Sequence, residues 1–195
     1  MINHMLSIAI AITTFLCSAH CFASSCVQVN GEPNDSVEMK QKKVEYARAV
    51  ISTSDYLSKD ERCVRMAIHY LAEQKATAAI PRLIELLGYE QEKIGTRKPN
   101  VFDRYPAIGG LAAMGANARP ALLHVIGTHK AESVQSQNAV SALMLMEDAR
   151  KNPGRVIKLL LLEADASSGS ESAEHFRGAA DLAKNEWCIV DNCAD

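Results

Sequence analysis

A short pattern that recurs three times along the chain constrains the fold more than any other feature. Each copy has an alanine, a leucine four residues later, and a proline nine or ten residues after the leucine. The copies begin at Ala67, Ala107 and Ala139. Residues four apart share one face of a helix, and proline is tolerated in the first turn of a helix because the amide it lacks has no partner there. The pattern therefore predicts three pairs of short helices that bury their apolar faces by packing on neighbouring pairs.

The sequence inside this pattern resembles HEAT or HEAT-like repeats. Ala-Ile-Pro-Arg-Leu-Ile-Glu-Leu-Leu at residues 79–87 and Leu-Ala-Ala-Met-Gly-Ala-Asn-Ala-Arg-Pro-Ala-Leu at residues 111–122 carry the resemblance, which covers about residues 63–162, roughly half of the chain. The second copy lacks the usual isoleucine before its proline, and the third has a polar turn at residues 147–151. The resemblance implies an all-α fold, a short α-solenoid of about three helix pairs, and a protein-binding scaffold rather than a particular activity.

Helices are also predicted on both sides of the repeats. Asp35 and Glu38 form a capping box, in which the Asp35 carboxylate accepts the Glu38 amide hydrogen and starts a flanking N-terminal helix. Residues 173–187 predict a closing helix that caps the last pair, as the end of a solenoid requires. Gly88 and Gly127 are expected to end helices in the left-handed conformation.

Two adjacent glycines, Gly109 and Gly110, lie inside the first helix predicted for the second copy. A glycine in a helix interior costs about 1 kcal/mol relative to alanine. The pair therefore implies either a packing reason, such as the close approach of a neighbouring helix, or a weakly formed helix.

The first 23 residues are predicted to be a signal peptide that is cleaved after Ala23. Residues 6–16 form an apolar stretch, and the small residues Cys21 and Ala23 that follow suit a signal peptidase. The stretch is shorter than the ~20 residues that span a bilayer, so no membrane span is expected. Residues 24–195 then form a single helical-repeat domain, periplasmic or secreted. No Lys or Arg precedes the stretch, and a buried hydrophobic N-terminal helix is the alternative interpretation.

Four cysteines remain after cleavage, and in an oxidising compartment they predict two disulfides. Of the three possible pairings we prefer Cys26–Cys63, which tethers the N-terminal arm, with Cys188–Cys193, which closes a small terminal loop. A lipidated Cys26 is an alternative, although residues 23–25 match a lipoprotein signal poorly. No paired C-x2-C spacing is present, so no metal site is expected.

The connector at residues 89–105 is the candidate contact surface. It is longer than the repeat requires, and long structured loops are often functional. It also concentrates aromatic and arginine residues, which are enriched at interface hot spots, in a chain that is only 5% aromatic. The residues predicted to bind a partner are Tyr89, Arg97, Lys98, Phe102, Arg104 and Tyr105. The alternative is a solvated loop in which Phe102 and Tyr105 only anchor the next helix.

Catalysis and nucleic-acid binding are not predicted. The formal net charge of -2 argues against an electrostatic grip on nucleic acid or acidic lipid. His69 and His124 lie among apolar residues, and neither they nor the other histidines form an H-E-x-x-H pair. No nucleophile elbow or phosphate-binding glycine loop is present. We therefore expect a non-enzymatic protein without a cofactor.

These features predict an exported binding or scaffold protein that engages a protein partner through the repeat groove and the 89–105 connector. One version is a periplasmic immunity or inhibitor protein that blocks an incoming toxin or hydrolase. One alternative is a HEAT-like lyase or other cofactor-handling protein, because such repeats also occur in pigment-attaching lyases. Another is a structural component of the envelope.

Overall fold

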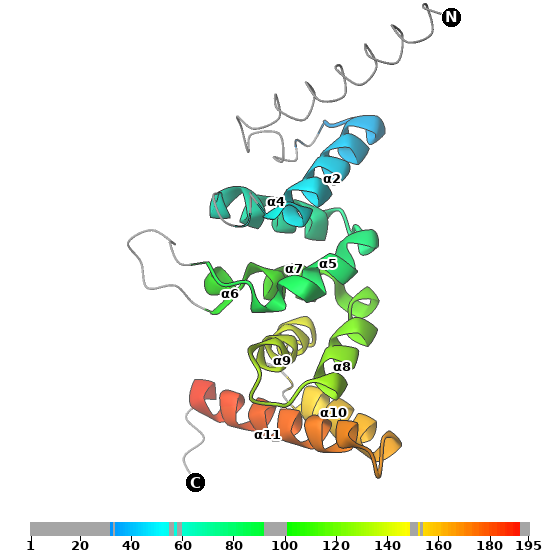
Figure 1. Ribbon diagram of the computed structural model, residues 1–195, viewed down its shortest axis with the longest axis vertical. Coiled ribbons are helices and arrows are strands. Elements are labelled where there is room, and N and C mark those ends of the chain that lie inside the picture. The colour runs from blue at the N-terminus through cyan, green and yellow to red at the C-terminus, as the bar shows by residue number, and fades with distance from the viewer. Residues whose placement is uncertain are drawn as a thin grey trace, which may run out of the picture.

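The computed structural model describes residues 32, 34–54, 57, 60–91, 101–148, 152 and 154–191, without the side chains of 102, 103 and 186–191. Within these residues every regular element is helical (Figure 1), which confirms the predicted all-α class. No helix in this part of the chain is long and apolar enough to span a bilayer. The α-helices are α2 (Val37–Ser52), α4 (Glu61–Glu73), α5 (Ile80–Glu85), α6 (Val101–Arg104), α7 (Pro106–Met114), α8 (Arg119–Thr128), α9 (Val134–Met146), α10 (Gly154–Ala166) and α11 (Glu171–Asp191).

The helices form an elongated stack, with α2 at one end and α10 and α11 at the other (Figure 1). One row runs through the whole stack, because α2 packs on α4, α4 on α7, α7 on α9, and α9 on α11. The shorter helix α5 packs against α7 and α8, and α8 packs against α9 and α11. Each helix therefore depends on its neighbours to cover its apolar face.

The alanines and leucines of the recurring pattern form the centre of this stack. All six side chains are 0% exposed and belong to one continuous core: Ala67, Leu71, Ala107, Leu111, Ala139 and Leu143. The small alanines let neighbouring helices approach closely, and each buried leucine contributes about 1.5–3 kcal/mol of hydrophobic stabilisation. The spacing of four residues thus identified the core face of α4, α7 and α9 correctly.

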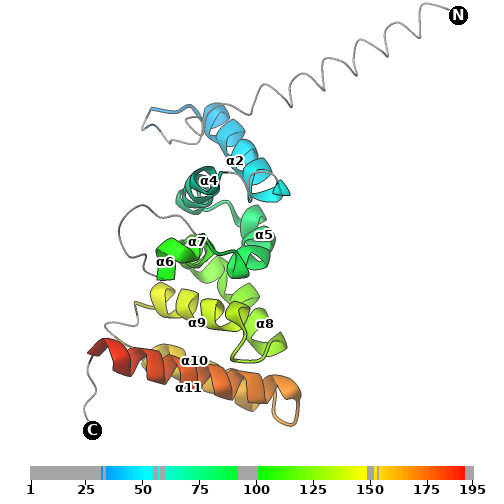
Figure 2. The ribbon, with the colours of Figure 1, turned by 60° about the vertical axis from the view of Figure 1, so that its left-hand side comes forward.

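The last helices are arranged differently from a simple third pair. The pattern pairs the helix that follows Ala139 with the helix that follows Pro153, but α10 packs mainly along α11 (Figures 1 and 2). The closing helix starts at Glu171 and is longer than predicted, so it offers a long apolar face to α8, α9 and α10. The packing of α10 is therefore set by the closing helix.

The predicted capping box at the start of α2 is wrong by one residue. Ser36 is the N-cap, and its hydroxyl oxygen accepts the Met39 amide hydrogen at 3.2 Å. Asp35 instead accepts a hydrogen bond from the Lys43 ammonium at 2.7 Å, between two side chains that are no more than 15% exposed. The same carboxylate oxygen also accepts the Glu32 amide hydrogen at 3.1 Å, so Asp35 is engaged by groups other than the Glu38 amide and Ser36 caps the helix.

The expected left-handed conformation of Gly88 and Gly127 is also wrong. Among the described residues the glycines with positive φ are Gly115 at 62° and Gly169 at 83°. Gly127 lies inside α8, where a Cβ atom would stand 3.0 Å from the ring of Phe176 on α11. A larger residue at position 127 would be crowded, because α8 and α11 approach each other closely there.

Candidate functional site

The two ends of the 89–105 connector are joined into a stem, which we define as Tyr89, Glu90, Gln91, Arg104 and Tyr105. The Gln91 amide donates to the Arg104 carbonyl at 2.8 Å. The Glu90 carboxylate forms an ion pair with Arg104 at 3.3 Å and accepts the Tyr105 hydroxyl at 3.4 Å. These bonds hold the beginning and the end of the connector together.

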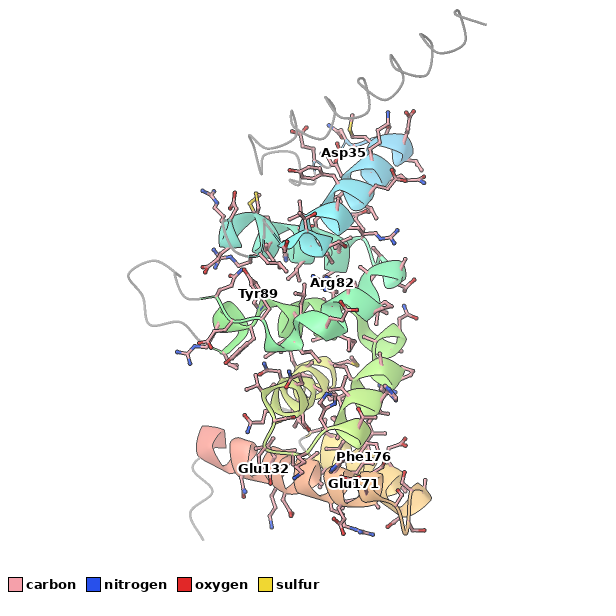
Figure 3. The ribbon with its side chains drawn as sticks, viewed as in Figure 1. Asp35, Arg82, Tyr89, Glu132, Glu171 and Phe176 are labelled. Atoms are coloured by element: carbon pink, nitrogen blue, oxygen red, sulfur yellow. The ribbon has the colours of Figure 1, made fainter. Side chains whose placement is uncertain are left out.

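The stem is also fastened to the start of α4. The Tyr89 hydroxyl donates to the Leu57 carbonyl at 2.8 Å, and Tyr89 lies between α4 and α6 (Figure 3). The Gln91 side-chain amide donates to the Glu61 carbonyl at 2.7 Å, and Gln91 is only 2% exposed. Sequence reasoning missed Gln91, because a glutamine in a polar run gives no sign that it will be buried.

The predicted contact residues fall into three groups. Tyr89 and Tyr105 are partly buried and pack against the core, so they hold the stem in place. The side chain of Arg104 is 50% exposed and is paired with Glu90. The remaining predicted positions, which are Arg97, Lys98 and the side chain of Phe102, lie outside the described residues.

The buried tyrosines predict a loss of stability at alkaline pH. Burial raises the pKa of Tyr70, Tyr89 and Tyr105 above the ordinary value of 10.0. The unfolded chain then loses its phenol protons first, so the tyrosine contribution to the free energy of unfolding should be constant below about pH 9 and should fall as the pH rises through about 10. Urea unfolding between about pH 8 and about pH 11 measures this decline. Tyr89→Phe should make the decline shallower, and an unchanged slope in that variant would contradict the assignment.

A groove of about 280 Å³ opens between α4 and α7 beside the stem. One wall comes from α4 and from Lys75, two residues after its end, and the other from α7, whose first residue Pro106 directly follows Tyr105 of the stem. The floor is made of small residues, among them Gly109, Gly110 and Ala113. The stem therefore leads directly into one wall of the groove, and we call the stem and the groove together the α4–α7 face.

The charged residues of the groove all come from the α4 side. His69 and Glu73 lie 3.0 Å apart and face each other. Arg65 has no ion pair with any described residue, whereas the Lys75 ammonium donates to the Ala113 carbonyl across the groove. Lys75 has a φ of 50°, a conformation that costs a non-glycine residue free energy and that is rare outside turns. Since α7 carries no charged residue, the groove has more positive than negative charge.

The two adjacent glycines of α7 have different surroundings. A Cβ atom on Gly110 would stand 2.6 Å from the Ile68 Cγ2 atom of α4, so Gly110 permits the close packing of α4 and α7. A Cβ atom on Gly109 would meet nothing within 4 Å, so no packing reason exists for this glycine within the described structure. Gly109 is partly exposed at the floor of the groove, where no side chain covers its backbone.

A second, larger cleft of about 520 Å³ lies between α8, the end of α10 and the beginning of α11. Leu123 and Phe176 provide apolar lining, and Arg119, His124 and Glu163 provide polar lining. The Arg119 guanidinium is already paired with the Glu147 carboxylate. His69 and His124, expected among apolar residues, are both exposed in these two hollows.

Cys63 is the one predicted disulfide cysteine whose side chain is described. It is 2% exposed and takes part in a disulfide. Cys26, Cys193 and the side chain of Cys188 lie outside the described residues. The pairings Cys26–Cys63 and Cys188–Cys193 therefore stay predictions.

Comparison of the chain with models of protein families, with curated proteins and with solved structures found no match in any of the three. Among the residues that the structure describes, no group of three or more His, Cys, Asp or Glu side chains is placed to hold a metal ion. The proposed function therefore rests on the geometry of the α4–α7 face.

Proposed function

We propose that this chain is an exported binding protein, a short HEAT-like solenoid that holds a protein partner on its α4–α7 face. The observation that carries this proposal is the fastening of a long connector beside an unfilled groove. Gln91 is buried at the beginning of the connector. Its backbone amide is bonded to Arg104 at the end of the connector, and its side chain is bonded to Glu61 of α4. A surface that is held in shape before binding loses less conformational freedom when the partner arrives.

The solenoid part of the proposal is supported by packing that repeats with the sequence. The alanine and leucine of each copy are fully buried, and the helices that carry them pack in chain order, α4 on α7 and α7 on α9. Repeat proteins pack each unit only on its neighbours and present long surfaces for binding. The leader-like segment and the even number of cysteines after it support export.

A photo-crosslinking amino acid tests the binding role in the cells that produce the protein. We place it at Ala113, which is exposed in the groove, and at Lys158, which is exposed on α10, as the control. One discrete protein adduct at Ala113 and none of that mass at Lys158 supports the proposal. Deletion of residues 92–100 should weaken the adduct. An adduct that forms equally at both positions, or at neither, contradicts the proposal.

Export is tested on the same purified protein. The intact mass should correspond to a chain that starts at Ser24, and it should be lower by two hydrogens for each disulfide. Recovery of the full-length chain with its leader from the cytosol would overturn this part. The immunity or inhibitor version adds that the adduct partner is a toxin or hydrolase, whose activity the mature protein should then inhibit at equal molar amounts.

The cleft between α8 and α11 favours one alternative, a cofactor-handling protein. Its volume of about 520 Å³ lies within the range of small-molecule sites, and it combines apolar with polar lining. The purified protein would then carry a bound chromophore, visible in its absorbance and as an added mass in native mass spectrometry. Protein purified without such a group would leave the binding role as the better proposal.

A further inference from the structure

The charge of the groove indicates what kind of partner it accepts. Arg65 has no ion pair with a described residue, and Lys75 stands at the other end of the groove. The one acidic residue of the groove, Glu73, is faced by His69. The opposite wall contributes no charge, so the groove is lined by two cations, Arg65 and Lys75, and one carboxylate, Glu73, which is not paired with either of them. Complementary charges guide partners to each other and disfavour partners of the wrong sign.

The floor of the groove adds a second requirement. Gly109 has no side chain there and no described residue comes within 4 Å of where its Cβ atom would stand, while Ala113 is exposed one turn further along α7. Glycine is used where another backbone has to approach closely. A compact segment can therefore lie on α7 while its side chains reach the α4 wall.

We propose that the α4–α7 groove binds a segment of the protein partner, and that this segment places one acidic side chain at each end of the groove. This inference rests on the proposed function. Arg65 lies on α4 eight residues before its last residue, Glu73, which at a helical rise of 1.5 Å per residue is about 12 Å away, and Lys75 follows in the turn after the helix. The segment carries two carboxylates at about this spacing. Nucleic acid, the other polyanion, suits the groove less, because the chain has a net charge of -2 and only two cations here lack an acidic partner.

The Ala113 crosslink also tests this inference, now with charge variants. Arg65→Glu should lower the yield of the adduct at least about tenfold, because it places like charges against each other. Arg48→Glu is the matched control, since Arg48 is exposed on α2, away from the groove, and forms no ion pair with a described residue. Arg65→Gln should give an intermediate yield. Thermal unfolding of all three variants shows that they fold.

The crosslinked segment of the partner is then sequenced by mass spectrometry. An acidic segment, together with a loss in Arg65→Glu that Arg48→Glu does not share, supports the inference. A neutral or basic segment, or equal yields in Arg65→Glu and Arg48→Glu, overturns the inference and leaves the binding role intact. An adduct that nuclease removes shows a nucleic-acid ligand and overturns both. If the protein with the crosslinker at position 113 and no charge substitution forms no adduct, both the inference and the binding role are overturned.

Discussion

Leu111→Ala is expected to lower the free energy of unfolding by about 2–5 kcal/mol, because it leaves a cavity in the core as well as removing apolar burial. Leu111 is 0% exposed on α7, the helix that packs against both α4 and α9. Small domains are stable by only about 5–15 kcal/mol, so this one change removes a large share of the total. Urea unfolding followed by circular dichroism measures it, provided that the transition is two-state.

Leu162→Ala is the matched control for this prediction. Leu162 is the same residue type on helix α10, but its side chain is 56% exposed. The change should alter the free energy of unfolding by no more than about 0.5 kcal/mol, because surface substitutions remove little burial and alanine is the better helix former. If the two substitutions had similar effects, the placement of the core along the recurring leucines would be wrong.

The helices and their buried faces were accessible from the sequence because they depend on local spacing. An alanine and a leucine four residues apart specify one helix face, and a proline marks the first turn of the next helix. The same reasoning would have separated the two glycines of α7. Gly110 lies three residues after the buried Ala107 and so shares its face, while Gly109 points away from it.

The packing of α10 and the details of the stem could not be predicted in this way. The hydrogen bonds from Tyr89 to Leu57 and from Gln91 to Glu61 join residues about thirty positions apart, and no local pattern specifies such a pair. The groove depends on the distance between α4 and α7, which Gly110 and Ile68 set together. Arg65 and Lys75 were missed as site residues because their role appears only once an uncharged helix lies opposite them.

Gly110→Ala and Gly109→Ala are expected to change stability in opposite directions, although the two residues are neighbours. At Gly110 the new methyl group would stand 2.6 Å from Ile68 Cγ2, and Ile68 is itself buried in the core at 1% exposed. Overpacking of this kind costs about 1–3 kcal/mol, more than the helix propensity that alanine gains. Gly110→Ala should therefore lower the free energy of unfolding.

At Gly109 the methyl group would enter open space, so only the gain in helix propensity remains. Gly109→Ala should raise the free energy of unfolding by up to about 1 kcal/mol. Urea unfolding of the two variants beside the parent protein measures both effects. If Gly109→Ala destabilises the protein as much as Gly110→Ala does, the space above Gly109 is filled and no groove exists there. If it stabilises the protein, this glycine weakens the fold in the free protein, and a bound segment that packs closely against the α7 backbone at Gly109 provides a reason for it.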